Sequence, residues 1–334
     1  MRLNIARAHT LTCRVLQAAG LDPREAAIVA DHLIDCELRG LSYGGLPRAL
    51  SIFERMTAPD YRRGAIEVAR ETPISALVVG RNNPGYLVAF EAANIAIDKA
   101  TTQGMAMVGG NQTWHTGMLS YYAERAAEAG LVSLIASNAS PLVAPYGGRA
   151  GRFGTNPICF GFPSADQPVI WDIGTSSIMH GEIVLARRLG LQLPQGIAFD
   201  AEGEPTTDPD AALAGVVSAW GGHRGSGLAI VVQLLGAMAA APAMPLGMVD
   251  YGCLFVMMKP DLLMDANEYA EQVAEYARVI RATPPVKGGE PVRMPFDRSR
   301  ATRERNRQAD AVEVSDTVYE RLEAAAGSNR RATD

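Results

Sequence analysis

The sequence predicts an α/β fold in which a mixed, largely antiparallel sheet is joined to an α-helical domain built from both chain ends. Both ends carry apolar residues at helical spacing, whereas short β-rich runs alternate with helical segments from residue 74 onward. Glycine and proline are frequent after residue 137, which suits a mixed sheet better than a purely parallel one. We therefore expect residues 1–72 and 290–334 to form the helical domain, and residues 73–289 to form the α/β domain.

The clearest helix start lies near the N-terminus, in the run Asp22-Pro23-Arg24-Glu25. Asp22 can cap the helix, Pro23 suits its first turn, and Glu25 can complete a capping box. The helix is expected to end at Gly40, and a second helix is expected over residues 48–56. The apolar face of the first helix consists of Ile28, Val29, Leu33 and Ile34.

The middle of the chain alternates strands and helices. Strands are expected at residues 75–79, 105–108, 131–137, 158–162, 169–173 and 254–258, and helices at residues 86–102, 118–129, 225–240 and 266–281. A linker rich in proline and glycine covers residues 283–291. The C-terminal part is helical again, over residues 299–308 and 318–325, and we expect it to pack against the N-terminal helices.

Composition bounds the class of protein. The 334 residues are 48% hydrophobic and carry a formal net charge of -5, which argues against a nucleic-acid partner despite the arginine-rich residues 298–307. Four scattered cysteines and five histidines show neither a CxxC pair nor the spacing of a metal site, so we expect no metal ion. The most apolar stretch, residues 228–241, is shorter than the roughly 20 residues of a membrane span. With no secretion signal, we expect a cytoplasmic protein without a membrane partner.

Four polar clusters lie where strands end or helices begin, the positions at which α/β proteins place ligands. The first, Asn111-Gln112-Thr113-Trp114-His115-Thr116-Gly117, contains an imidazole that can exchange a proton near neutral pH. The second, Gly154-Thr155-Asn156-Pro157, offers a hydroxyl and an amide to a small carboxylate. Both clusters also have a structural interpretation, in which His115 belongs to the core and Thr155 caps a turn.

The other two clusters contain charged residues. The third runs from Asp172-Ile173-Gly174-Thr175-Ser176 to His180-Gly181-Glu182, and it suits contact with a ribose, a phosphate or a proton donor, or only the start of a helix. The fourth, Gly222-His223-Arg224-Gly225-Ser226-Gly227, is a turn whose amides can meet a phosphate, or whose glycines only relieve steric strain. Neither a Rossmann GxGxxG loop nor a P-loop motif is present.

The order of these clusters resembles the malate/L-lactate dehydrogenase family of the type-2 kind, and the resemblance covers nearly the whole chain. That family includes ureidoglycolate, sulfolactate and diketogulonate dehydrogenases and the reductases of piperideine- and pyrroline-2-carboxylate. Six of its motifs occur here in the family's order. They are matched by Trp114-His115-Thr116-Gly117, Leu142 to Gly148, Gly154 to Pro157, Asp172 to Ser176, Asp200 to Pro209 and Gly221 to Leu228.

The resemblance implies a homodimer with its site at the subunit interface and a cofactor fold distinct from Rossmann. It implies hydride transfer between NAD(P)H and C2 of a small 2-oxo acid or cyclic imino acid, whose carboxylate would be held by Arg48 and Thr155. Arg224 and the basic tail favour NADPH as partners for a 2′-phosphate. The segments that would hold the cofactor are His115-Thr116-Gly117-Met118-Leu119, Asp172-Ile173-Gly174-Thr175-Ser176, His223-Arg224 and Phe296-Asp297-Arg298.

One departure from the family pattern concerns the proton donor. In the family this is a histidine in a Ser-His-Gly motif, relayed to an acid that is matched here by Glu182. The corresponding segment contains no histidine, so Tyr43 replaces either the histidine or the serine, and in the second case Gly44 replaces the histidine. The candidate catalytic residues are therefore Tyr43, His115 and Glu182, and His180 is a further candidate. The segment reads Arg39-Gly40-Leu41-Ser42-Tyr43-Gly44-Gly45-Leu46-Pro47-Arg48.

Two alternatives to an oxo-acid reductase stay open at the level of sequence. A protonated imine accepts hydride without a proton donor, so the missing histidine harms imine reduction less than ketone reduction. The chain can also be a catalytically inactive homologue that binds a dinucleotide or a partner protein.

Overall fold

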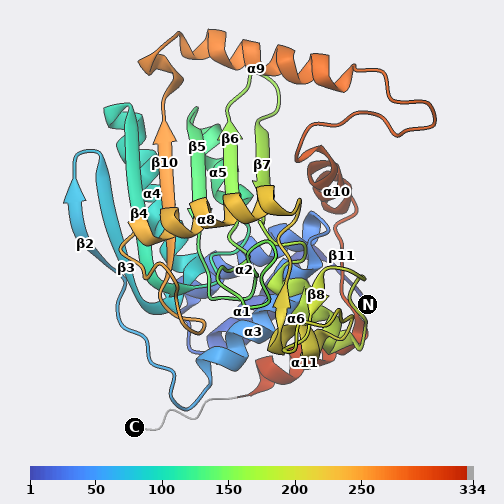
Figure 1. Cartoon of the computed structure of the whole chain (residues 1–334). Coiled ribbons are helices and arrows are strands. Elements are labelled where there is room, and N and C mark those ends of the chain that lie inside the picture. The colour runs from blue at the N-terminus through green and yellow to red at the C-terminus, as the bar shows by residue number, and fades with distance from the viewer. Residues whose placement is uncertain (329–334) are drawn as a thin grey trace.

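A single seven-stranded sheet forms the centre of the molecule (Figure 1). The structure is a computed structural model and describes residues 1–328. Along the sheet the strands follow the order β2-β3-β4-β10-β5-β6-β7. Their bounds are Glu67–Thr72 (β2), Ser75–Pro84 (β3), Met105–Trp114 (β4), Tyr251–Met258 (β10), Val132–Ser137 (β5), Ile158–Phe162 (β6) and Val169–Ile173 (β7).

The sheet is mixed and largely antiparallel, so the predicted fold class is confirmed. Strands β3 and β4 run parallel, and the other neighbouring pairs of this sheet are antiparallel. The parallel pair needs a crossover connection, and α4 (Gly85–Gln103) supplies it. Strand β4 extends to Trp114, well beyond the predicted residues 105–108, because β3 and β10 hydrogen-bond to it on both sides.

Helices cover both faces of the sheet (Figure 1). Helix α4 and α5 (Ser120–Glu128) lie on one face, and α8 (His223–Met238) crosses the other. Helix α4 approaches the strands closely because its buried side is built from alanines. These alanines are Ala89, Ala92, Ala93, Ala96 and Ala100.

The two ends of the chain form one helical layer below the sheet in Figure 1. The short strands β1 (Arg2–Leu3) and β11 (Val312–Glu313) pair with each other. Helix α1 packs against both α2 and the C-terminal helix α11, as the sequence predicted. The helices of this layer are α1 (Ile5–Ala18), α2 (Pro23–Leu38), α3 (Leu46–Met56) and α11 (Asp316–Gly327).

A buried ion cluster ties α10 (Asp297–Gln308) to α2 and α5. The fully buried Arg39 donates to Asp35 and to Glu124, and Arg303 bridges the same two carboxylates from α10. The Arg39 guanidinium also lies 4.4 Å above the ring of Phe296. The cluster therefore fixes the segment before α10 against the helical layer.

The remaining elements are shorter or more peripheral. Helix α9 (Ala266–Arg281) crosses the top of Figure 1, after the 3-10 turn η2 (Pro260–Leu262). Helix α6 (His180–Leu189), α7 (Pro209–Ala214), β8 (Ala198–Phe199) and β9 (Val216–Val217) form a separate small cluster beside α3. In the part of the chain that the structure describes, no helix is both long and apolar enough to cross a bilayer.

Local sequence signals located most elements. The predicted capping box exists, with the Asp22 carboxylate accepting from the Glu25 amide and the Glu25 carboxylate accepting from the Asp22 amide. Strands β6 and β7 and helix α9 have the predicted bounds. Strand β2 precedes residue 73 yet is hydrogen-bonded into the sheet. The division into two domains stays a prediction.

Candidate active site

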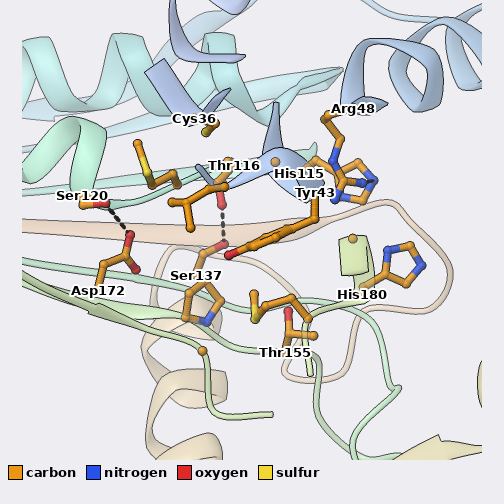
Figure 2. Close-up of a pocket in the computed structure, with 18 of the residues that line it drawn as sticks. Cys36, Tyr43, Arg48, His115, Thr116, Ser120, Ser137, Thr155, Asp172 and His180 are labelled. Atoms are coloured by element: carbon orange, nitrogen blue, oxygen red, sulfur yellow. Dashed lines mark hydrogen bonds between the residues drawn. The ribbon is translucent and has the colours of Figure 1, made fainter. Parts of the chain in front are cut away.

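A cavity of about 490 Å³ lies where the helical layer meets the ends of the central strands. Such a volume is typical of small-molecule sites. Figure 2 shows Asp172 and Ser120 toward one end of the labelled set, and Arg48, His115 and His180 toward the other. Of the residues predicted from sequence, the cavity is lined by Tyr43, Arg48, His115, Thr116, Gly117, Met118, Thr155, Asp172, Gly174, His180, Phe296 and Arg298.

Arg48 and Tyr43 reach the cavity because a buried glutamate holds the turn between them. Glu37 accepts a hydrogen bond of 2.7 Å from the Leu46 amide, and burial raises the pKa of its carboxyl to about 7. Gly45 passes so close to this carboxyl that a side chain there would collide with it. The turn η1 (Ser42–Gly44) is therefore fixed against α2 at the start of α3.

Arg48 is the fixed cation of the cavity. Its residue is 8% exposed, and the Arg48 Nη1 atom lies 3.4 Å from His115 Nε2. No carboxylate lies within ion-pair distance of Arg48 anywhere in residues 1–328. A buried charge without a counter-charge is costly, so this guanidinium suits an anionic ligand.

Tyr43 crosses the middle of the cavity, and its hydroxyl end lies toward Ser137 (Figure 2). Burial raises the pKa of the Tyr43 phenol, and the nearby carboxylates of Asp172 and Glu182 raise it further. The phenol therefore keeps its proton at neutral pH. It can donate a hydrogen bond to a ligand oxygen, but it is a weak acid.

The loop after β4 brings His115 and Thr116 to the cavity wall. His115 has a positive φ of 47°, an uncommon conformation for a residue other than glycine. The Met118 amide, in the same loop, donates to Nε2 of His32 at 2.9 Å, and Gly117 leaves room for that ring. Burial, and then the Arg48 charge, lower the pKa of His115 well below its ordinary value. His115 is therefore neutral.

Asp172 closes the other end of the labelled set. Its carboxylate accepts from the backbone amide and the hydroxyl of Ser120, at 2.7 and 2.8 Å, at the start of α5. Burial raises the pKa of this carboxyl, and the hydrogen bonds from Ser120 oppose the rise. Asp172 thus joins the end of β7 to α5, which is compatible with a wall of the cavity and with a structural cap.

Thr155 is positioned by hydrogen bonds that join its motif to two distant segments. Thr175 donates to the Thr155 carbonyl at 3.2 Å, and Asn156 donates to Ala229 and Gln233 of α8. These bonds hold the run in place, and the Thr155 side chain faces the cavity (Figure 2).

His180 begins α6 and lines the cavity. Its ring centroid lies 6.0 Å from that of His115, and its Nδ1 atom is buried without a hydrogen-bond partner in the described chain. Burial, followed by the charges of Arg48 and Arg187, lowers the pKa of His180 to about 4. Glu182 does not line the cavity; its carboxylate accepts from the Met179 amide at 2.8 Å and so supports the first turn of α6.

Not every predicted site residue reaches this cavity. His223 and Arg224 are exposed at the start of α8. The predicted residues outside the lining are Leu119, Ile173, Thr175, Ser176, Glu182, His223, Arg224 and Asp297. Sequence reasoning also missed lining residues, above all Ser137 and Asn138. Both follow the apolar run of β5, and that strand-end position was the available signal.

The chain matches the malate/L-lactate dehydrogenase family over residues 3–323. It belongs to this family. The chain is therefore an oxidoreductase, and a nicotinamide cofactor and small hydroxy acids suit its site. Within residues 1–328, no group of three or more side chains is arranged to hold a metal ion.

Relatives with assigned activities agree with this membership. The chain is 32% identical to the L-sulfolactate dehydrogenase of Methanothermobacter thermautotrophicus, over 96% of this chain and 95% of that protein. It is 29% identical to the ureidoglycolate dehydrogenase (NAD+) of Escherichia coli O157:H7, over 96% and 95%. It is 35% identical to the (2R)-3-sulfolactate dehydrogenase (NADP+) of Chromohalobacter salexigens, over 70% of each chain.

Solved structures agree as well. A dehydrogenase from Sinorhizobium meliloti superimposes with a TM-score of 0.87 at 30% identity, covering 98% of each chain. The delta1-piperideine-2-carboxylate reductase of Pseudomonas syringae gives a TM-score of 0.83 at 26% identity, covering 97% of this chain and 99% of that one.

Proposed function

We propose that this protein interconverts small 2-oxo and 2-hydroxy acids by hydride transfer between C2 of the substrate and a nicotinamide cofactor. The observation that carries the proposal is Arg48, a buried guanidinium in the cavity without a carboxylate partner in the described chain. A substrate carboxylate would supply the missing charge, and the Thr155 hydroxyl would add a hydrogen bond. Tyr43 would donate a hydrogen bond to the oxygen on C2.

The donor set of the cavity suits a dinucleotide. The hydroxyl oxygens of Thr116 and Ser137 can accept hydrogen bonds, while Trp171 and Phe296 offer apolar surface. When bound, the cofactor supplies or accepts the hydride. Residues of this chain hold it, and the apolar walls exclude water from the reacting atoms.

We propose that NADPH is preferred over NADH. Arg298 lines the cavity and also a second hollow of about 540 Å³, which Arg293 and Arg305 line as well. Arg298 has no ion-pair partner in residues 1–328, whereas Arg300 and Arg303 of the same helix are paired. A free guanidinium beside the cavity suits a phosphate group. Arg224, exposed on α8, is a second candidate for this role if it reaches the site of a partner subunit.

We propose a homodimer in which α8 lies at the subunit interface. Helix α8 is apolar on all sides, and its outer side chains remain exposed in the single chain. These exposed apolar side chains form a stripe along α8, and an exposed apolar stripe marks an interaction surface. With α8 at the interface, His223 and Arg224 would lie near the partner subunit. The stripe consists of Ile230 (48% exposed), Val231 (50%), Leu234 (59%) and Met238 (59%).

A second candidate function is reduction of a cyclic imino acid. The fold matches a piperideine-2-carboxylate reductase, and the 39–48 segment lacks a histidine. A protonated imine carries its own proton, so its reduction needs no proton-donating side chain in the cavity.

The test is a turnover screen with each reduced cofactor, followed by absorbance at 340 nm. Pyruvate, oxaloacetate, sulfopyruvate and piperideine-2-carboxylate would be compared at pH 6 and 8. Titration of NADH and NADPH fluorescence would measure binding separately. Turnover of oxo acids supports the main proposal, and turnover of the imine alone supports the second. Binding without any turnover would indicate an inactive homologue, and absence of binding would overturn both proposals.

A further inference from the structure

We propose that His180 exchanges the proton with the substrate oxygen on C2, an inference that rests on the proposed function. The 39–48 segment brings no imidazole to the cavity, yet reduction of a 2-oxo acid needs a proton for the new hydroxyl. Of the five histidines in the chain, which all lie in the described residues, His115 and His180 line the cavity. The proton donor is therefore one of the titratable side chains that line the cavity.

Three other cavity groups are unsuited to proton exchange. Burial raises the pKa of the Cys36 thiol and of the Tyr43 phenol, so both hold their protons too firmly near neutral pH. The Asp172 carboxylate is engaged by the amide and hydroxyl of Ser120 at the start of α5. Removing it from these bonds would leave a helix N-terminus uncapped.

One ring nitrogen of His115 contacts Arg48. Its Nε2 atom lies 3.4 Å from the Arg48 Nη1 atom, and a guanidinium can only donate hydrogen bonds. The lone pair of this nitrogen therefore faces a cation. A proton placed on Nε2 would lie against the Arg48 charge, so we assign to His115 the orientation of the guanidinium.

Unlike His115, His180 makes no hydrogen bond to another side chain. No hydrogen bond joins either of its ring nitrogens to another residue of the described chain, and Nδ1 is buried without a partner. The ring faces His115 across 6.0 Å at an interplanar angle of 34°, on the side of the cavity where Arg48 lies (Figure 2). A substrate carboxylate on Arg48 would place the C2 oxygen between the guanidinium and the His180 ring.

The charges around His180 make its protonation depend on the substrate. Arg48 of α3 and Arg187 of α6 disfavour the imidazolium, while Tyr43 of η1 and His115 of the β4 loop are neutral. Glu182, on the same helix, is hydrogen-bonded to the Met179 amide. A bound carboxylate offsets the Arg48 charge, so substrate binding favours proton uptake by His180.

The step balances as follows. In reduction, C2 of the oxo acid gains a hydride, the C=O electron pair moves to oxygen, and that oxygen takes the proton from the His180 imidazolium. The oxo acid is reduced to the hydroxy acid while NAD(P)H is oxidised to NAD(P)+. His180 then regains a proton from solvent. In the reverse direction neutral His180 takes the hydroxyl proton as hydride leaves C2.

The test compares His180→Gln and His180→Asn with His9→Gln, a partly exposed histidine of α1 that bonds to Asp31 outside the cavity. For both His180 variants we expect kcat for oxo-acid reduction to fall by roughly 100-fold or more, which is typical of a lost general acid, with substrate KM changed little. The slope of kcat with pH should also flatten. Unchanged circular dichroism and Tm would establish that the variants fold.

A second readout does not depend on turnover. Oxamate, a carboxylate analogue of a 2-oxo acid, would be bound to the protein with NADPH at pH 5.5 in two buffers of different ionisation enthalpy, followed by calorimetry. We expect proton uptake in the unmodified protein and in His9→Gln, and none in either His180 variant. Retained kcat, or retained uptake, in both His180 variants would overturn the role of His180 while leaving the proposed function intact. If the unmodified protein fails to bind NAD(P)H, the proposed function itself is wrong.

Discussion

Replacing Arg48 by methionine should lower activity while making the protein more stable. Arg48 is buried and has no carboxylate partner in the described chain, so its charge opposes folding and is retained for a ligand. Methionine keeps most of the side-chain volume without the charge. We expect the free energy of unfolding to rise by roughly 1–4 kcal/mol, the gain found when buried ion pairs are replaced by apolar groups of similar volume.

The loss of activity can be bounded in the same way. Removing one partner of a buried, hydrogen-bonded charge pair costs about 2–5 kcal/mol, which corresponds to roughly 30- to 5000-fold in kcat/KM for the acid substrate. The affinity for NADPH should change little, because Arg48 lies at the opposite end of the labelled set from Asp172 (Figure 2). Urea denaturation and steady-state kinetics would measure the two effects.

Arg188→Met is the matched control. The Arg188 side chain is 7% exposed and donates to Glu54 and to the Pro47 carbonyl, but it does not line the cavity. This variant should lose stability and keep its kcat/KM. If Arg48→Met loses less than about tenfold in kcat/KM, or is destabilised as much as the control, then Arg48 is a structural cation and the substrate carboxylate lies elsewhere.

Three further predictions concern other residues. Tyr43→Phe should lower kcat/KM by only roughly 2- to 12-fold, the value of one neutral hydrogen bond, and a loss above about 100-fold would assign proton donation to Tyr43. Arg298→Gln should weaken NADPH binding about tenfold and leave NADH binding unchanged, as measured by fluorescence titration. The exposed control Arg278→Gln should change neither. An equal effect on both cofactors, or the same effect in the control, would contradict a phosphate-binding role. Glu37 has a folded-state pKa of about 7 against an ordinary value of 4.5, so the folded state binds the extra proton between these values and stability falls as pH rises through this window, by up to roughly 3 kcal/mol. Glu37→Gln keeps the acceptor for the Leu46 amide and should flatten urea-measured stability between pH 4.5 and 7; an unchanged slope would place the titrating group elsewhere.

Local signals in the sequence located the parts of the site that local structure fixes. The residue types of the Gly154-Thr155-Asn156-Pro157 run were informative by themselves, although the bonds that hold the run join it to Thr175 and Ala229. The start of α2 at Asp22 was equally clear, because capping involves residues three apart. Arg48 reaches the cavity since α3 begins directly after the turn that precedes it.

Contacts between distant segments could not be read from the sequence. His32 accepts from Met118, 86 positions later, and this bond holds the loop that carries His115. Glu182 was predicted as a relay acid, but whether its carboxylate met a proton donor or the Met179 amide depended on how α6 began. Pairing with β3 buries polar residues in the second half of β4. In the sequence these residues resemble a loop, so β4 was predicted too short.

The charges of the cavity indicate an order of events. Each nearby carboxylate is already engaged: Glu37 by the Leu46 amide, Asp172 by Ser120 and Glu182 by the Met179 amide. The Arg48 charge is therefore unbalanced at this end of the cavity, and burial together with this charge holds both cavity histidines neutral. A bound substrate carboxylate would change the field at both rings at once, but Nε2 of His115 faces the Arg48 guanidinium, whereas neither ring nitrogen of His180 is hydrogen-bonded in the described chain. Proton uptake thus follows substrate binding, and the protein has no acid ready to act on a substrate that lacks a carboxylate.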